Sequence, residues 1–213
     1  MRIGALLKQS FVDWEGKTAA VIFTKGCNFR CGYCHNPSLV LPELLNRTTD
    51  ISEKEIFDYL KTRKNRLDGV VITGGEPTIH NDLKGFISSI KSLSYKIKLD
   101  TNGTNPLLLA ELLSEKLIDF IAMDIKTIIE AEKYYKVSNY SNPDLMSKIN
   151  SLIKIIRNSG IEYQLRTTVL PNHHTKEIVN KLQQKFVKDN YVIQQFRQCD
   201  VLERTLNSIK SWK

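Results

Sequence analysis

The sequence predicts an α/β fold, an incomplete (β/α)6 barrel of the TIM-like kind. Apolar strand-like segments alternate strictly with helix-like segments, a pattern typical of parallel sheets with right-handed crossovers. Six such strands are present, and the chain has 213 residues. A complete eight-fold barrel needs ~250 residues, so six units are what this length supplies. An open doubly wound sheet would follow from the same alternation and is the alternative.

The predicted strands are short segments rich in apolar side chains. The first, residues 19–24, reads Ala-Ala-Val-Ile-Phe-Thr without a polar interruption, as a buried strand does. The other five are predicted at residues 69–73, 95–99, 120–125, 163–170 and 191–196.

The predicted helices lie between these strands. Ser52 is a suitable N-cap, and Glu55, three residues later, is its capping-box partner. Residues 81–93 have apolar side chains at the three- and four-residue spacing of an amphipathic helix. Further helices are predicted to begin at Pro106 and to span residues 144–158 and 175–186.

Composition indicates an ordinary globular protein, with 41% hydrophobic and 25% charged residues. No composition change marks a linker, so we expect residues 1–213 to form one domain. No apolar run approaches the ~20 residues of a membrane span. The net charge of +8 suits an acidic partner or a solvated basic surface, and no nucleic-acid motif accompanies it. Without a targeting segment and with free thiols, a cytoplasmic location is expected.

Three cysteines, Cys27, Cys31 and Cys34, lie in one loop with the spacing C-x3-C-x2-C. Three thiolates on one short loop can bind a metal centre and leave it one ligand short, so that a small molecule occupies the open position. Structural zinc usually has four ligands, often in two separated pairs. An iron–sulfur cluster is therefore favoured. A zinc-binding interaction module and a plain electron-transfer protein are alternatives from other functional classes.

Polar motifs follow the later strands, where the active sites of parallel α/β folds lie. Gly74-Gly75-Glu76-Pro77 follows the second predicted strand, and its glycines permit close approach of a ligand to the backbone. Asp100-Thr101-Asn102-Gly103 follows the third, and Asp124-Ile125-Lys126 ends the fourth. Arg166 lies in the otherwise apolar fifth strand, where it needs a carboxylate partner from the protein or from a ligand.

The cysteine loop resembles the cluster-binding signature of the radical S-adenosylmethionine (SAM) enzymes, in which an aromatic residue, here Tyr33, precedes the last cysteine. The resemblance implies a 4Fe-4S cluster held by Cys27, Cys31 and Cys34, with SAM on the fourth iron. It implies the same incomplete (β/α)6 barrel.

The strand-end motifs carry the resemblance further. Gly-Gly-Glu-Pro matches the family motif that binds the SAM amino group, and the segments at Asp100 and Asp124 resemble those of glycyl-radical-enzyme activases. This implies that Lys126 and Arg166 bind SAM and that Asp100 and Asp124 hold a monovalent cation. The implied cofactor site comprises Tyr33, Gly74, Gly75, Glu76, Asp100, Asn102, Lys126 and Arg166.

Residues 11–37 look most like anaerobic ribonucleoside-triphosphate reductase activating proteins. That resemblance implies a glycyl-radical enzyme as partner and flavodoxin or ferredoxin as electron donor. Activation of a pyruvate formate-lyase type of enzyme, or action on a small molecule or RNA, is the alternative. Asp13 lies in a segment that resembles the start of many activases, which implies contact with the protein substrate.

Four further residues in the last part of the chain receive predictions. Arg197 stands where the pyruvate formate-lyase activator has a functional histidine, so that role is not transferred. Cys199 is separate from the cysteine triad and is interpreted as a structural thiol. His173 and His174 follow Pro171 in a loop and are expected to be exposed.

Overall fold

The computed structural model describes residues 1–196 and residue 202, and its centre is one seven-stranded sheet with the strands in sequential order. β2 to β7 run parallel, and β1 pairs antiparallel with β2. The strands are β1 (Ile3–Ser10), β2 (Ala19–Thr24), β3 (Gly69–Gly74), β4 (Lys96–Thr101), β5 (Phe120–Asp124), β6 (Glu162–Val169) and β7 (Tyr191–Gln195). Arg197 and Cys199 lie outside the described residues, so their roles stay predictions.

The six predicted strands are present, but β1 was not expected. Its sequence, Ile-Gly-Ala-Leu-Leu-Lys-Gln-Ser, contains several residue types that are depleted in strands. The hydrogen bonds of the pair with β2 stabilise β1 despite the low strand propensity of these residues. The register of this pair shifts twice along its length. β1 is an edge strand, so β2 is its only paired strand among the described residues, and on its other side Ile3 forms an isolated bridge with Ile51, whose N–H donates to the Ile3 carbonyl at 2.9 Å.

The predicted helices form close to their expected limits. Ser52 caps its helix by accepting a hydrogen bond from the Glu55 N–H at 3.2 Å, as the capping pattern predicts. The longer helices are α3 (Glu53–Thr62), α4 (Leu83–Lys91), α5 (Pro106–Ser114), α7 (Leu145–Asn158) and α8 (Lys176–Lys185). In the described part of the chain, three α-helices were not predicted: the one-turn α1 (Pro37–Val40) and α2 (Pro42–Leu45), and α6 (Ala131–Ser138).

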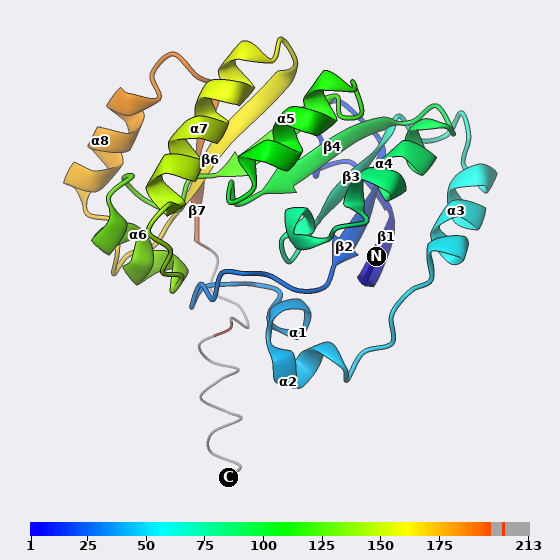
Figure 1. Cartoon of the computed structure of the whole chain (residues 1–213), viewed down its shortest axis with the longest axis horizontal. Helices are drawn as coiled ribbons and strands as arrows, with labels where there is room; N and C mark the ends of the chain where they lie inside the picture. The colour runs from blue at the N-terminus through cyan, green and yellow to red at the C-terminus, as the bar shows by residue number, and fades with distance from the viewer. Residues whose placement is uncertain (197–201, 203–213) are drawn as a thin grey trace.

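The two faces of the sheet have different surroundings. Alternate strand residues, such as Ile22, Ile72 and Leu99, join the buried residues of α3, α4, α5, α7 and α8 in one large core. The opposite face carries a smaller cluster made by Trp14, Ala19, Val21 and Val71. Figure 1 shows α4, α5 and α7 side by side across the sheet. Helices on one face are what an incomplete barrel has, whereas a doubly wound sheet is covered on both faces.

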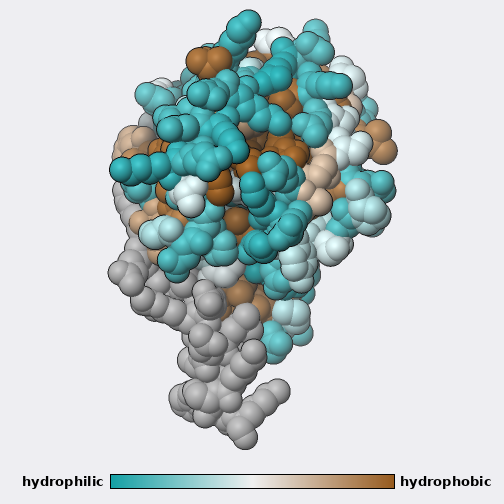
Figure 2. Space-filling model, turned by 90° about the vertical axis from the view of Figure 1, so that its left-hand side faces the viewer, coloured by the Kyte–Doolittle hydropathy of each residue, from teal (hydrophilic) through white to brown (hydrophobic). Residues whose placement is uncertain are grey.

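The surface beside α8 is mainly hydrophilic, and Figure 2 shows hydrophobic residues there in the gaps between polar side chains. Among the described residues, no helix is both long enough and apolar enough to cross a membrane.

Candidate active site

A pocket of about 270 Å³ opens at the carboxyl ends of the parallel strands. The predicted residues that line it are Cys27, Cys31, Tyr33, Cys34, Gly74, Gly75, Glu76, Asp100, Asn102, Asp124, Lys126 and Arg166. They come from the carboxyl ends of β3, β4 and β5, from the segments that follow β2, β3, β4 and β5, and from β6 itself. Parallel strands bring their carboxyl ends to one edge, which is why motifs far apart in the sequence meet here.

The cysteine loop is fixed by contacts from two other parts of the chain. The Arg30 N–H donates to the Ser138 carbonyl at the end of α6, at 2.8 Å, and its guanidinium donates to the Phe29 carbonyl within the loop. On the other side, the Leu202 N–H donates to the Cys34 carbonyl at 3.0 Å. The Leu202 side chain packs in a cluster with Val40 and Leu41. Contacts between protein groups alone therefore anchor the cysteine loop.

The donor set of this loop suits an iron–sulfur cluster. Burial raises the pKa of the Cys27 thiol to about 12 and raises the pKa values of Cys31 and Cys34, so iron has to displace a proton from each. Within the described part of the chain, no three His, Cys, Asp or Glu side chains converge on a point as a single bound ion requires. A four-iron cluster makes a different demand, because each of three thiolates binds its own iron.

The Gly74-Gly75-Glu76 turn is hydrogen-bonded to the start of the cysteine loop. The Gly75 N–H donates to the Thr24 carbonyl at 2.9 Å, and the Glu76 N–H donates to the Gly26 carbonyl at 2.8 Å. The Glu76 carboxylate is 1% exposed and points to the end of β4. There it accepts hydrogen bonds from the Thr101 hydroxyl at 2.8 Å and the Asn102 N–H at 2.6 Å. Glu76 thus fixes the β3 and β4 ends relative to each other.

Asn102 extends this bracing to the cysteines. Its side-chain amide donates to the Asn28 side-chain oxygen at 2.7 Å, and its own oxygen accepts from the Thr104 hydroxyl at 2.8 Å. Asn28 lies between Cys27 and Cys31, so the residue that directly follows β4 positions the cysteine loop. The sequence alone did not single out Asn28 or Thr101. The one feature of the sequence that points to them is their position, because Asn28 lies within the cysteine motif and Thr101 within the motif that begins at Asp100.

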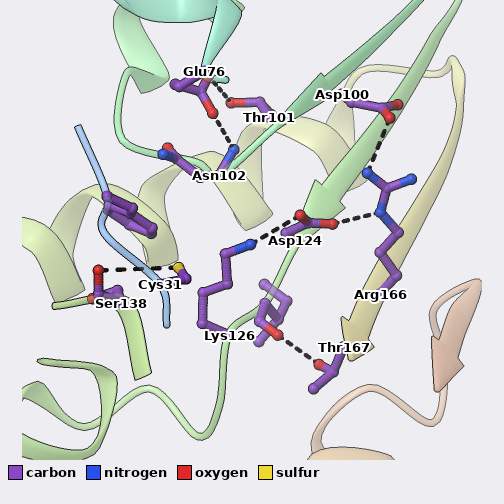
Figure 3. A network of polar contacts seen from close by, with 12 residues as sticks. Cys31, Glu76, Asp100, Thr101, Asn102, Asp124, Lys126, Ser138, Arg166 and Thr167 are labelled. Atoms are coloured by element: carbon purple, nitrogen blue, oxygen red, sulfur yellow. Dashed lines mark hydrogen bonds and ion pairs between the residues drawn. The ribbon is translucent and has the colours of Figure 1, made fainter. Parts of the chain in front are cut away.

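Charged side chains form a network on the opposite wall, shown in Figure 3. The Arg166 guanidinium extends from β6 and donates to one Asp124 oxygen and, at 3.0 Å, to Asp100 Oδ2. Lys126 Nζ donates to the other Asp124 oxygen at 3.0 Å. Of the two partners that the sequence left open for Arg166, the structure shows the protein carboxylates.

The electrostatics of the network follow from these pairings. Burial disfavours ionisation of Asp124, but the adjacent Arg166 and Lys126 outweigh it and hold the pKa of this carboxyl below its usual value. The same pairing raises the pKa of Lys126 against the effect of burial. Asp100 differs, because its Oδ1 is buried without a hydrogen-bond partner, and Lys98 Nζ is 3.8 Å away. A buried carboxylate oxygen left in this state is suited to a ligand or cation in the pocket.

Asp13 lies at the other end of the sheet. It is in the connection between Ser10 and Ala19, which pair with each other at the amino end of β2. Its carbonyl accepts a hydrogen bond from Lys98, and it lines a second pocket with Lys98 and Phe120. The structure therefore does not bring Asp13 to the cysteine pocket.

The prediction that His173 and His174 are both exposed is wrong for His174. His173 is exposed, but His174 is only 6% exposed, and its ring contacts the backbone of Leu170 and Lys126. The short turn after β6 folds back on itself and places the second histidine inside, which residue type alone did not indicate.

Comparison with known proteins agrees with this geometry. A sequence profile described as the radical SAM superfamily matches residues 21–184. MJ1227 of Methanocaldococcus jannaschii, named as a candidate glycyl-radical enzyme activating enzyme, is 32% identical over 97% of this chain and 85% of its own length. A pyruvate formate-lyase-activating enzyme of Listeria monocytogenes is 27% identical over the whole of this chain and 85% of its own length.

Solved structures show the fold. SuiB of Streptococcus suis superposes with a TM-score of 0.64 at 15% identity, covering 90% of this chain but 45% of the larger protein. SuiB bound to S-adenosylmethionine gives a TM-score of 0.63 at 16% identity, covering 90% of this chain and 48% of SuiB. This chain thus spans about half the length of these structural neighbours. By its sequence, the chain is an enzyme of the radical SAM superfamily, in the family of glycyl-radical enzyme activating enzymes.

Proposed function

We propose that this protein binds a 4Fe-4S cluster and SAM and generates a glycyl radical on a partner enzyme. The observation that carries the proposal is the pocket that joins the three cysteines to the strand-end motifs. With both groups bound, they would supply reductive cleavage of SAM to a 5′-deoxyadenosyl radical, which removes hydrogen from a glycine Cα. The chain itself would bind and orient SAM and exclude water and oxygen.

The predicted site residues fall into three groups in this proposal. Cys27, Cys31 and Cys34 would hold three irons. Backbone groups of Gly74 and Gly75 would meet the SAM amino group, with Glu76 and Asn102 fixing that wall. The other site residues are Tyr33, Asp100, Lys126 and Arg166. The positively charged side chains of Lys126 and Arg166 would face the SAM carboxylate or ribose.

A monovalent cation beside SAM is part of the proposal. Asp100 and Asp124 would be its ligands, and this assignment is supported by Asp100 Oδ1, which has no hydrogen-bond partner and has Lys98 Nζ 3.8 Å away. The Arg166 guanidinium already bridges the two residues, so a cation would share their oxygens with it. If the cation is required, activity should change when potassium or sodium is replaced by a bulky organic cation at constant ionic strength.

Anaerobic ribonucleoside-triphosphate reductase is our first candidate partner, because residues 11–37 resemble its activating proteins. An enzyme of the pyruvate formate-lyase type is the second, favoured by the Listeria relative.

We also propose a single domain over residues 1–213, a cytoplasmic location, and flavodoxin or ferredoxin as electron donor. A partner loop that reached both Asp13 and the cysteine pocket would lie along the face of the sheet that the helices leave open.

The decisive experiment is anaerobic reconstitution with iron and sulfide, followed by reduction and assay of 5′-deoxyadenosine with each candidate partner. A glycyl doublet in the electron paramagnetic resonance spectrum of one partner would identify the substrate. Cys31→Ala should abolish SAM cleavage, and Cys199→Ser, outside the triad, should retain it. Cleavage that survives Cys31→Ala would overturn the mechanism, and zinc in place of iron would favour an interaction module.

A further inference from the structure

The mechanism does not use His174, although this histidine is buried beside the site. It lies in the turn between β6 and α8, whose residues 173 and 174 both donate their backbone N–H to the Leu170 carbonyl, at 3.1 and 2.9 Å. The closed turn holds the imidazole ring against the segment that follows β5. The His174 side chain is buried, with 6% of the residue exposed, so it contacts the protein interior and not solvent.

Hydrogen bonding fixes which ring nitrogen carries the proton. Nδ1 accepts a hydrogen bond from the Leu170 N–H at 3.0 Å, so it holds no hydrogen. Nε2 must then carry the hydrogen, and it donates to the Lys126 carbonyl at 2.9 Å. Burial lowers the pKa of His174, which favours this neutral form.

The backbone of Lys126 is held on both sides, although it lies beyond the last paired residue of β5. Its N–H donates to the Tyr134 hydroxyl of α6 at 3.2 Å, and its carbonyl accepts from His174. The preceding carbonyl, of Ile125, accepts from the Thr167 hydroxyl at 2.7 Å. Side chains thus replace the missing strand neighbour, and the Lys126 ammonium is held 3.0 Å from Asp124 and 5.8 Å from the Tyr33 ring centre.

We propose that His174 is a positioning residue, which fixes the Lys126 backbone and so aims its ammonium at the anionic part of SAM. The inference rests on the proposed function, in which Lys126 binds SAM. His174 acts only through Lys126, because the ring contacts the lysine carbonyl and is not among the residues that line the pocket.

A double-mutant cycle on SAM affinity tests the proposal in the reconstituted protein. His174→Phe keeps the ring volume and removes both hydrogen bonds. It should weaken SAM binding about tenfold, the effect of losing roughly one hydrogen bond that orders a binding group. In a Lys126→Met background the same change should have less than about a twofold effect, since the ammonium to be aimed is gone.

The controls separate positioning from general loss of structure. His173→Phe alters the exposed neighbour and should leave SAM affinity unchanged. His174→Gln, which retains a donor and an acceptor, should recover most of the affinity lost in His174→Phe. Iron and sulfide content should stay at the wild-type level in all three variants.

A second readout needs neither cluster nor SAM. Hydrogen–deuterium exchange of the metal-free protein should show faster exchange at residues 125–127 in His174→Phe than in wild type. Tyr134→Phe deletes one hydroxyl and should accelerate exchange in the same segment. Tyr134→Phe serves as the positive control, because it removes the other side-chain hydrogen bond that holds the Lys126 backbone.

The outcomes are distinct. Equal loss of SAM affinity in the wild-type and Lys126→Met backgrounds, no recovery in His174→Gln, or unchanged exchange at residues 125–127 would each overturn the positioning role. No loss in Lys126→Met alone would instead refute the assignment of Lys126 as a SAM ligand, which belongs to the proposed function.

Discussion

At the scale of single residues, Gly75 shows how tightly the site backbone is packed. A Cβ on Gly75 would lie 1.8 Å from the Gly26 carbonyl oxygen and 2.7 Å from its carbon. Both are backbone atoms at the entrance to the cysteine loop, so neither can rotate away. Glycine is required here by the close approach of two chain segments.

Gly75→Ala should destabilise the protein by about 2 kcal/mol or more, because one of the two segments must move. SAM affinity should fall with it, since the displaced segment carries Cys27. Urea unfolding and equilibrium SAM binding would measure the two effects.

Gly85 provides the matched control. It is an exposed residue within α4, and a Cβ there would meet nothing within 4 Å. Gly85→Ala should stabilise the protein by about 0.5–1 kcal/mol through helix propensity. Equal effects of the two substitutions would contradict the packing argument.

At the scale of elements, Asp189 connects three of them in the last part of the described chain. Its carboxylate accepts two hydrogen bonds from the Arg157 guanidinium of α7, at 2.9 and 2.7 Å. It accepts a third from the Tyr163 hydroxyl of β6 at 2.8 Å. Asp189 lies just before β7, so it secures the edge strand of the sheet.

Stability should depend on pH through this residue. The hydrogen-bonded Arg157 lowers the pKa of Asp189 below its usual value in the folded state. Its stabilisation is therefore complete above the unfolded-state pKa of about 3.9 and is lost as the pH falls through the lower folded-state pKa.

Asp189→Asn should cost about 1 kcal/mol at pH 7, a modest value because the Arg157 side chain is 42% exposed. Urea midpoints of wild type and variant should converge as the pH falls below about 4. A difference that stayed constant down to a pH of about 2 would show that ionisation of Asp189 does not matter.

At the scale of the whole molecule, the two faces of the sheet carry hydrophobic cores of unequal size. The larger one lies between the sheet and its helices, and the smaller one is centred on Trp14 on the open face. Trp14 is 3% exposed and packs against Phe120, with 5.9 Å between ring centres. It closes the amino end of that face, opposite the pocket.

Trp14→Ala should destabilise the protein by about 3–5 kcal/mol, the usual cost of removing a buried tryptophan. Phe11→Ala, three residues earlier and 69% exposed, should change stability by less than about 0.5 kcal/mol. Unfolding followed by far-ultraviolet circular dichroism avoids the loss of the tryptophan signal. A small effect of Trp14→Ala would mean that the open face adds little to stability.

Prediction from sequence worked best for features with a local cause. The cap at Ser52 and the apolar spacing of α4 depend on residues within a few positions of each other. It failed for β1, whose ordering needs β2, and for His174, whose burial depends on how the turn after β6 closes.

The sequence by itself determined the order of strands and helices and the polar motifs at the strand ends, because alternating apolar segments and short motifs are local properties. The tertiary structure alone decided which charged groups meet. Arg166 reaches Asp100 across 66 positions, and His174 reaches Lys126 across 48. Such contacts join segments that are far apart in the sequence, and they form only when the parallel strands bring their carboxyl ends to one edge of the sheet.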